Sequence, residues 1–331
     1  MNKQDVVNAI LKDKVSEPAN GEGDAFAPSN IALAKYWGKR DPELHLPVTP
    51  SLSISLADRG THTKIAVHDN GADEIYLNNQ LISAESIFAS KTIAYLDLFR
   101  DNKDRFYRVD TTSNIPIAAG VASSASGFAA LIKSLESLYG WGLSNKQLSI
   151  LARIGSGSAS RSIWQGFVKW HAGYKEDGMD SFAEPIKQTW KELRIALLII
   201  SEDHKLVPSR EAMERTVETS KLYTAWPKKL NSDLKDLLRA IKDKDFSLLG
   251  RTAESNALAM HGTMLAAWPP IIYAKAETIA MIEKIWALRE EGFEIYFTED
   301  AGPNLKLLFL EKDSAKVLEA FPNIDIIAPF L

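Results

Sequence analysis

A run of small residues between Pro116 and Gly127 has the composition of a phosphate-binding loop. Small side chains let a backbone approach a ligand closely, free N–H groups at a helix start attract anions, and serine hydroxyls add donors. A glycine–serine loop is a weak signal, so a small-residue helix packed tightly on a sheet stays open as an alternative. The candidates in this run are Ala119, Gly120, Ser123, Ser124 and Ser126.

A second run of small residues, from Gly155 to Ser162, places Arg161 beside several hydroxyls, among them Ser156 and Ser158. The guanidinium group of arginine is a planar fork of donors that suits a carboxylate or a phosphate. Read alone, this segment also fits a flexible turn with a surface arginine.

The third cluster is Lys35-Tyr-Trp-Gly-Lys39-Arg-Asp41, with Asn30 five residues before it. Three cations within six residues, mixed with two aromatic side chains, fit an anion pocket whose aromatic walls exclude water and so strengthen charge interactions. The alternative is a solvated basic patch with lysine stems lying along the surface.

Asp300 begins an Asp-Ala-Gly-Pro-Asn turn, where a carboxylate is either a turn cap or a rigidly held base. None of the six histidines has a partner at metal-ligand spacing, and no His-Glu-x-x-His motif occurs. The sequence therefore predicts no metal site built from protein ligands.

The elements that must position these residues mix strands and helices without a regular alternation, so the predicted fold class is α+β. Apolar residues at helical spacing predict a helix over 128–138 and a shorter one over 148–154. Further helices are expected over 209–220, 233–241 and 274–290. Strands are expected over 63–68, 74–77, 105–112, 194–201, 294–298 and 306–310.

The chain length favours one large or two intimate domains. We expect an N-terminal tail or short helix over 1–24, a domain over 25–190 and a second over 191–331, with one cleft shared between them.

Composition excludes several classes of function. The 39 basic and 43 acidic residues give a net charge of −4, which argues against nucleic-acid binding. The chain has no cysteine, so disulfides and thiol nucleophiles are absent. No apolar run reaches the roughly 18 residues that a membrane span needs, and the N-terminus lacks the apolar core of a signal peptide. These features predict a cytoplasmic protein.

Five segments, in register, resemble the motifs of the diphosphomevalonate decarboxylases. The resemblance covers the chain from about Phe26 to the C-terminus. It implies the GHMP kinase fold, with the active site in the cleft between two halves, ATP and Mg²⁺ as cosubstrates, and commonly a homodimer. The segments are 30–41, 118–130, 155–162, 260–271 and 300–304.

The resemblance also implies a reaction. The C3 hydroxyl of mevalonate 5-diphosphate is phosphorylated, and loss of phosphate and CO₂ then gives isopentenyl diphosphate. By position, Asp300 would orient or deprotonate the hydroxyl, and Arg161 would hold the carboxylate with help from Asn30. Lys35 and Lys39, alongside Tyr36, would balance phosphate charge.

In the same assignment, Ser156 and Ser158 would lie near the substrate or the transferring phosphoryl group. ATP would bind along the first loop, at Ala119, Gly120, Ser123, Ser124 and Ser126.

The chain departs from the family pattern at four places. Thr49-Pro50-Ser51 stands where these enzymes usually show Asn-Ser-Ser, and Gln80 stands where many members have an arginine for the 5-diphosphate. Glu299 replaces a large apolar residue, and Ser160 replaces a common cysteine. The first two make mevalonate 5-phosphate an alternative substrate, in which case the product is isopentenyl phosphate. The motifs also fit a GHMP kinase that does not decarboxylate, or a silent ligand-binding member of the fold.

Overall fold

The computed structural model describes residues 1–115, 123–203 and 205–330 of the chain. Its larger sheet is organised by one long strand, β4 (Ser51–His68), which pairs with β1 (Gly23–Ala34) along most of its length. The other edge of β4 pairs with β7 (Phe106–Ser113) and, at its start, with β8 (Phe167–Trp170). The remaining strands of this sheet are β5 (Glu74–Leu77), β6 (Gln80–Leu81) and β9 (Ala183–Pro185).

The start of β4 alternates serine with leucine and isoleucine, and successive side chains of a strand point to opposite faces. Leu52, Ile54 and Leu56 therefore enter a core shared with the second half of the chain. Ser51 lies on the other face, where its hydroxyl meets a buried arginine described below.

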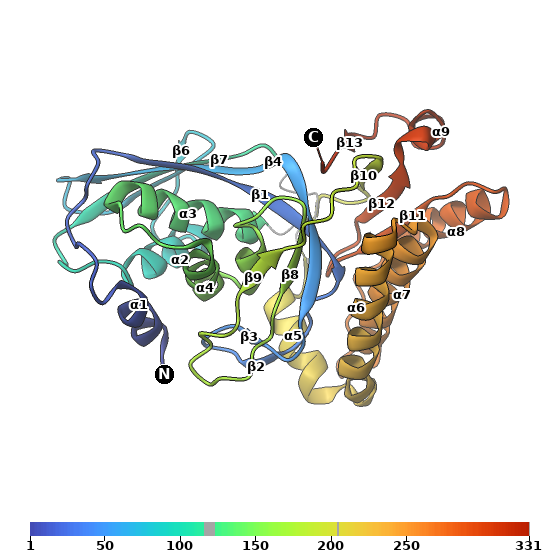
Figure 1. Ribbon diagram of the computed structural model, residues 1–331, viewed down its shortest axis with the longest axis horizontal. Helices are drawn as coiled ribbons and strands as arrows, with labels where there is room; N and C mark the ends of the chain where they lie inside the picture. Colours follow the sequence, from blue (N-terminus) through green and yellow to red (C-terminus); the bar gives the residue numbers. More distant parts are fainter. Residues whose placement is uncertain (116–122, 204, 331) are drawn as a thin grey trace.

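Helices α2 (Ile87–Leu96), α3 (Ser123–Tyr139) and α4 (Asn145–Gly155) cover one face of this sheet (Figure 1). Their buried apolar residues form the first core, in which Leu131, Leu135 and Leu138 come from the predicted helix over 128–138. A capping box formed by Ser144 and Gln147 begins α4.

Residues 1–24 are not a free tail, because they include the helix α1 (Lys3–Leu11). Its Val6, Val7 and Ile10 are buried in the first core. Of the two alternatives expected for this segment, the structure has the short helix.

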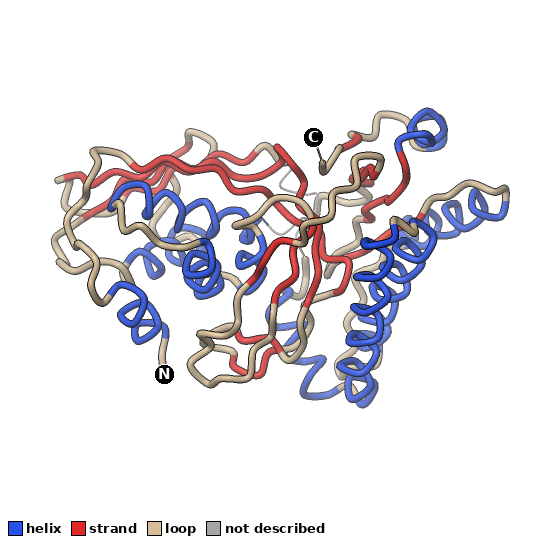
Figure 2. The backbone as a smooth tube through the Cα atoms, viewed as in Figure 1, coloured by secondary structure: helices blue, strands red, loops and turns tan. Residues whose placement is uncertain are grey.

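The second half contains a smaller sheet in the order β11 (Tyr296–Glu299), β12 (Leu305–Leu310), β10 (Leu193–Leu198) and β13 (Ile326–Ile327). Helices α6 (Trp226–Asp243) and α7 (Phe246–Leu265) run side by side and pack on one face of it (Figures 1 and 2). Helices α8 (Ala276–Glu290) and α9 (Ser314–Ala320) pack on the other. The remaining elements are α5 (Ser209–Thr219) and a small pair of strands, β2 (Lys39–Asp41) and β3 (Leu46–Pro47).

The α+β prediction is confirmed, and the predicted helices appear as α3, α4, α5, α6 and α8. Several elements were not predicted, among them α2, β8, α9 and the first part of β4, and two of the omissions have a clear physical reason. Helix α7 is buried on most of its circumference and so has no clear 3.6-residue pattern. Strand β1 contains Pro28 and a pairing irregularity beside it. Within the described residues, no helix is both long and apolar enough to cross a membrane.

Candidate active site

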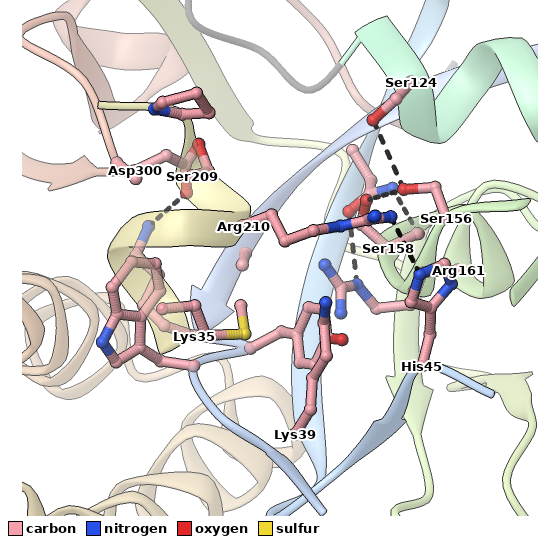
Figure 3. A pocket seen from close by; sticks show the side chains of 18 of the residues that line it. Lys35, Lys39, His45, Ser124, Ser156, Ser158, Arg161, Ser209, Arg210 and Asp300 are labelled. Carbon is pink, nitrogen blue, oxygen red and sulfur yellow. Dashed lines mark hydrogen bonds and ion pairs between the residues drawn. The ribbon is translucent and has the colours of Figure 1, made fainter. Parts of the chain in front are cut away.

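A cavity of about 500 Å³ opens where the two halves meet (Figure 3). Its walls come from the end of β1, the start of α3, the end of α4 with the short 3-10 helix Gly157–Arg161, the start of α5, and the turn after β11. Among the described residues that line it, Asp300 is the only carboxylate, whereas six are cations. The cations are Lys35, Lys39, Lys91, Arg161, Lys205 and Arg210. The cavity is therefore suited to strongly anionic ligands.

Asp300 lies between two buried lysines. Its Oδ1 is 2.8 Å from Lys35 Nζ, and its Oδ2 is 3.3 Å from Lys306 Nζ. Burial by itself would raise the pKa of Asp300, but the charges and hydrogen bonds of the two lysines outweigh it and hold this pKa well below its usual range. Burial lowers the pKa of Lys35, against the effect of Asp300. The Asp300 side chain is 26% exposed, so this fixed carboxylate still faces the cavity.

Behind Asp300 lie two groups that do not line the cavity. Glu299 is 2% exposed, and no described residue hydrogen-bonds its Oε1. Burial raises the pKa of Glu299 to about 8. His261 Nε2 is 3.0 Å from the Asp300 main-chain oxygen and 3.5 Å from Glu299 Oε2, and burial lowers the pKa of His261 to about 4. Near neutral pH this pair therefore carries little net charge.

Arg161 is buried and held by neutral acceptors. Its Nε donates to Asn30 Oδ1 at 3.2 Å, and its Nη1 donates to Ser51 Oγ at 2.6 Å. Asn30 is fixed in turn, because its Nδ2 donates to Ser162 Oγ at 2.8 Å. Burial lowers the pKa of Arg161 to about 10, which leaves it cationic at neutral pH. Arg161 thus keeps an uncancelled charge at the cavity wall.

The Tyr36 hydroxyl is buried and has no hydrogen-bond partner among the described residues, although Tyr36 lines the cavity. Its ring packs edge-on against Trp170, with centroids 4.7 Å apart. Burial raises the pKa of Tyr36 above its usual value, so the hydroxyl stays protonated. A buried hydroxyl without a partner is costly unless a ligand or water satisfies it.

Serine hydroxyls from two helices line one wall. Ser156 Oγ lies 3.3 Å from Ser124 Oγ and 3.4 Å from Ser158 Oγ (Figure 3). Ser126 faces the other way, because residues two apart on a helix point to opposite sides. Its hydroxyl contacts Thr61 at 2.7 Å and Ser29 at 3.0 Å, and Ser126 does not line the cavity. Its role in ATP binding stays a prediction. Ala119, Gly120 and the side chain of Ser123 lie outside the described part of the chain.

Several site residues were missed from the sequence. Lys306 sits in the apolar run of β12, and a lysine inside a buried strand was a signal that a partner carboxylate exists. Lys205 precedes α5, and its Nζ is 3.3 Å from Ser209 Oγ. Arg210 and His45 line the cavity beside Lys39, and burial, followed by the charge of Arg210, lowers the pKa of Lys39 to about 8.

Gln80, which was expected near the substrate, is exposed on β6 and does not line the cavity. Three cations, Lys39, Arg40 and Lys91, are candidates to supply the charge that Gln80 lacks, but Arg40 donates to the main-chain oxygen of Lys175 at 2.9 Å. Lys39 and Lys91 do line the cavity. Gln80 therefore gives no structural reason to expect weaker binding of a diphosphate.

No group of three or more histidine, aspartate or glutamate residues is placed to hold a metal ion within the described residues. Carboxylates are scarce in the cavity, so a divalent cation would depend mainly on oxygen atoms supplied by the ligands.

Comparisons with known proteins agree across both halves. Residues 27–183 match the model of the diphosphomevalonate decarboxylase-like N-terminal domain, and residues 195–326 match that of the mevalonate 5-diphosphate decarboxylase C-terminal domain. The chain is 37% identical over 314 residues to diphosphomevalonate decarboxylase mvd1 of Aspergillus fumigatus, covering 88% of this chain and 77% of the relative. It is 34% identical over 318 residues to the diphosphomevalonate decarboxylase of Homo sapiens, covering 89% and 78%.

Solved structures are also similar. Mevalonate diphosphate decarboxylase from Staphylococcus aureus has a TM-score of 0.87 at 37% identity, covering 93% of this chain and 95% of that one. The enzyme from Enterococcus faecalis has a TM-score of 0.85 at 39% identity, covering 92% and 95%. The MDDEF protein, solved with MVAPP, AMPPCP and magnesium, has a TM-score of 0.85 at 40% identity, covering 92% and 95%.

Proposed function

This chain belongs to the diphosphomevalonate decarboxylase family, and we propose that it converts mevalonate 5-diphosphate to isopentenyl diphosphate with consumption of ATP. The C3 hydroxyl is phosphorylated first, and loss of phosphate and CO₂ follows. The observation that carries the proposal is one cavity with an ionised carboxylate between two lysines, and with Arg161 and Arg210 on its other walls.

In the first step, Asp300 accepts a hydrogen bond from the C3 hydroxyl. This bond orients the hydroxyl oxygen toward the γ-phosphate of ATP. Two lysines hold the pKa of Asp300 well below its usual range, so Asp300 is a weak base and mainly an orienting group. Lys35 and Lys205 add positive charge beside it, and phosphoryl transfer depends on such positioning and charge compensation.

In the second step, Arg161 holds the substrate carboxylate through its free N–H groups. The electron pair of the C–CO₂ bond forms the new double bond as the C3–O bond breaks, and phosphate leaves with the oxygen. Fixed orientation of the breaking C–CO₂ bond lowers the barrier, and hydroxyl donors at Ser156 and Ser158 stabilise the leaving phosphate.

At the other end, Lys39, Arg210 and the unpaired Tyr36 hydroxyl bind the 5-diphosphate. Ser124, in the first turn of α3, lies along the ATP phosphates, where a helix start favours anions. Mg²⁺ would be held mainly by the phosphate oxygens of ATP and would neutralise their charge, since Asp300 is the one carboxylate among the described residues that line the cavity. The division near residue 190 and a homodimeric assembly remain predictions.

Measuring ADP and CO₂ from the same reaction tests the proposal. With mevalonate 5-diphosphate, we expect ADP and CO₂ in equal amounts. ADP without CO₂, from mevalonate or from either of its 5-phosphorylated forms, would leave a kinase and reject the decarboxylase.

Arg161→Lys gives a second arm, because lysine keeps the charge but loses the fork of donors. We expect CO₂ release to fall at least as much as ADP formation. Arg108→Lys, on the exposed part of β7, is the matched control and should behave as the unmodified chain does.

A further inference from the structure

His45 makes two hydrogen bonds that fix its tautomer. Its Nδ1 is 2.9 Å from the main-chain oxygen of Arg153, and its Nε2 is 3.1 Å from Arg210 Nη2. A carbonyl oxygen only accepts and a guanidinium only donates. Nδ1 must therefore carry the proton, and the bare Nε2 accepts from Arg210. Figure 3 shows Arg210 reaching from α5 across the cavity to His45.

The surroundings of His45 keep the imidazole neutral. The residue is 3% exposed, and the nearby charges of Lys3, Lys39 and Arg210 are all positive. Burial lowers the pKa of His45 to about 3, with these cations acting in the same direction and the bond to Arg153 opposing them. The imidazole is therefore neutral near pH 7, and its Nε2 can accept a hydrogen bond from Arg210.

Several half-buried arginines of this chain are held differently, by carboxylates, whereas Arg210 is itself exposed at the cavity wall. Arg100 pairs with Asp73 at 2.7 Å, and Arg289 pairs with Glu254 at 2.6 Å. Arg210 has no ion pair among the described residues. A carboxylate partner would cancel much of its charge, whereas a neutral imidazole holds the guanidinium in place and leaves its charge for a ligand.

We propose that His45 is a positioning residue that holds the Arg210 guanidinium at the cavity wall and thereby sets the affinity for the terminal phosphate of the substrate diphosphate. This inference rests on the proposed function, in which Arg210 binds that diphosphate. In this role His45 acts only through Arg210, without touching the reacting atoms.

The backbone at His45 has φ 54°, in the left-handed region, where asparagine is tolerated. His45→Asn keeps an N–H group that can donate to the Arg153 carbonyl but is too short to accept from Arg210. His45→Gln is the conservative variant, because its oxygen can reach Arg210. The two variants therefore separate loss of the acceptor from loss of the histidine.

The first measurement is calorimetric binding of mevalonate 5-diphosphate in the absence of ATP. We expect His45→Asn to weaken binding about tenfold, since Arg210 must then be ordered by the ligand itself. His45→Gln should stay within about threefold of the unmodified chain. Binding of mevalonate 5-phosphate should fall less in His45→Asn, and kcat for the diphosphate should change by less than about threefold.

A double-mutant cycle tests the route of the effect. Once Arg210→Gln is present, His45→Asn should weaken binding no further, because coupled residues are not additive. Arg215→Gln, on the same helix but paired with Glu211, is the control, and its effect should add to that of His45→Asn. Melting temperatures of all variants identify any loss of folding.

Two results overturn the role of His45: unchanged diphosphate affinity in folded His45→Asn, or an undiminished effect of that change when Arg210 is already glutamine. The proposed function is judged separately, on the unmodified chain. Failure of that chain to bind mevalonate 5-diphosphate would reject the proposed function, whatever the variants do.

Discussion

At the scale of single residues, the charged side chains of the cavity are held in two ways, by opposite charges or by neutral acceptors. Asp300 is paired with Lys35 and Lys306, so its position and its ionised state are fixed before any ligand arrives. Arg161 is held instead by neutral oxygen atoms of Asn30 and Ser51. The first arrangement preorganises a carboxylate, and the second keeps a cation available for an anionic ligand.

The role of Asp300 predicts the effect of Asp300→Asn, which keeps the shape of the side chain and removes its charge. We expect kcat to fall about 100-fold or more, with a much smaller change in KM. Steady-state kinetics measures both. Asp325→Asn, at an exposed carboxylate paired with Arg59, is the control. Activity of Asp300→Asn within a few-fold of the unmodified chain would make Asp300 only a turn residue.

Glu299 predicts a pH dependence of stability. Its pKa in the folded chain is raised to about 8, so between pH 4.5 and 8 the folded state binds more protons than the unfolded state. Stability is therefore lost as pH rises through this range. The Glu299→Gln side chain cannot ionise, so this loss is absent from the variant. The melting temperature of the variant minus that of the unmodified chain should therefore be larger at pH 8 than at pH 5, by at least about 2 °C.

Thermal melts at several pH values make this measurement, with the exposed Glu319→Gln as control. A difference between Glu299→Gln and the unmodified chain that does not change with pH would show that Glu299 has an ordinary carboxyl pKa.

At the scale of elements, strand ends and helix starts bring the site together. The end of β1 delivers Lys35 and Tyr36, the turn after β11 delivers Asp300, and the start of α5 delivers Arg210. The Asp300 turn is itself braced, because Asn304 Oδ1 accepts from the main-chain N–H groups of Ile200 and Ser201 at 2.7 and 2.9 Å. Elements far apart in the chain thus line one cavity.

Helix α1 carries the prediction at this scale. Val7 is 1% exposed in the first core, so Val7→Ala removes two methyl groups from a packed site. We expect the free energy of unfolding to fall by about 1–3 kcal/mol, measured by urea denaturation. Asn8→Ala, on the exposed side of the same helix, should cost less than about 0.5 kcal/mol. Equal effects at the two positions would mean that α1 does not pack on the domain in solution.

At the scale of the whole molecule, a chain of net charge −4 concentrates positive charge in one cavity between its halves. Lys39 and Arg210 lie together at one end of it, which favours a ligand with more than one phosphate group at that end. We therefore expect kcat/KM for mevalonate 5-diphosphate to exceed that for mevalonate 5-phosphate by about tenfold or more, as for one additional charged contact.

Kinetics with both substrates, at the same Mg²⁺ and salt concentration, measures this preference. Gln80→Arg is the internal control, and because Gln80 is exposed outside the cavity the ratio should not change. Preference for the monophosphate would change the substrate while leaving the fold and the roles of Asp300 and Arg161 in place.

The sequence by itself determined what depends on neighbours along the chain. Contiguous residue types identified the segments that hold Lys35, Arg161 and Asp300, and apolar spacing identified helices such as α3. Local pattern was sufficient there because a helix face or a tight turn is specified within a few residues.

Only the tertiary structure decided which groups meet. The pairing of Lys306 with Asp300, the bond from Arg210 to His45, and the turning of Ser126 toward the sheet all depend on packing between elements distant in sequence. Burial also changed the chemistry, since the raised pKa of Glu299 and the lowered pKa of His45 come first from desolvation. The sequence gives the type of each residue, but burial and neighbouring groups in the folded chain determine its charge state and its partner.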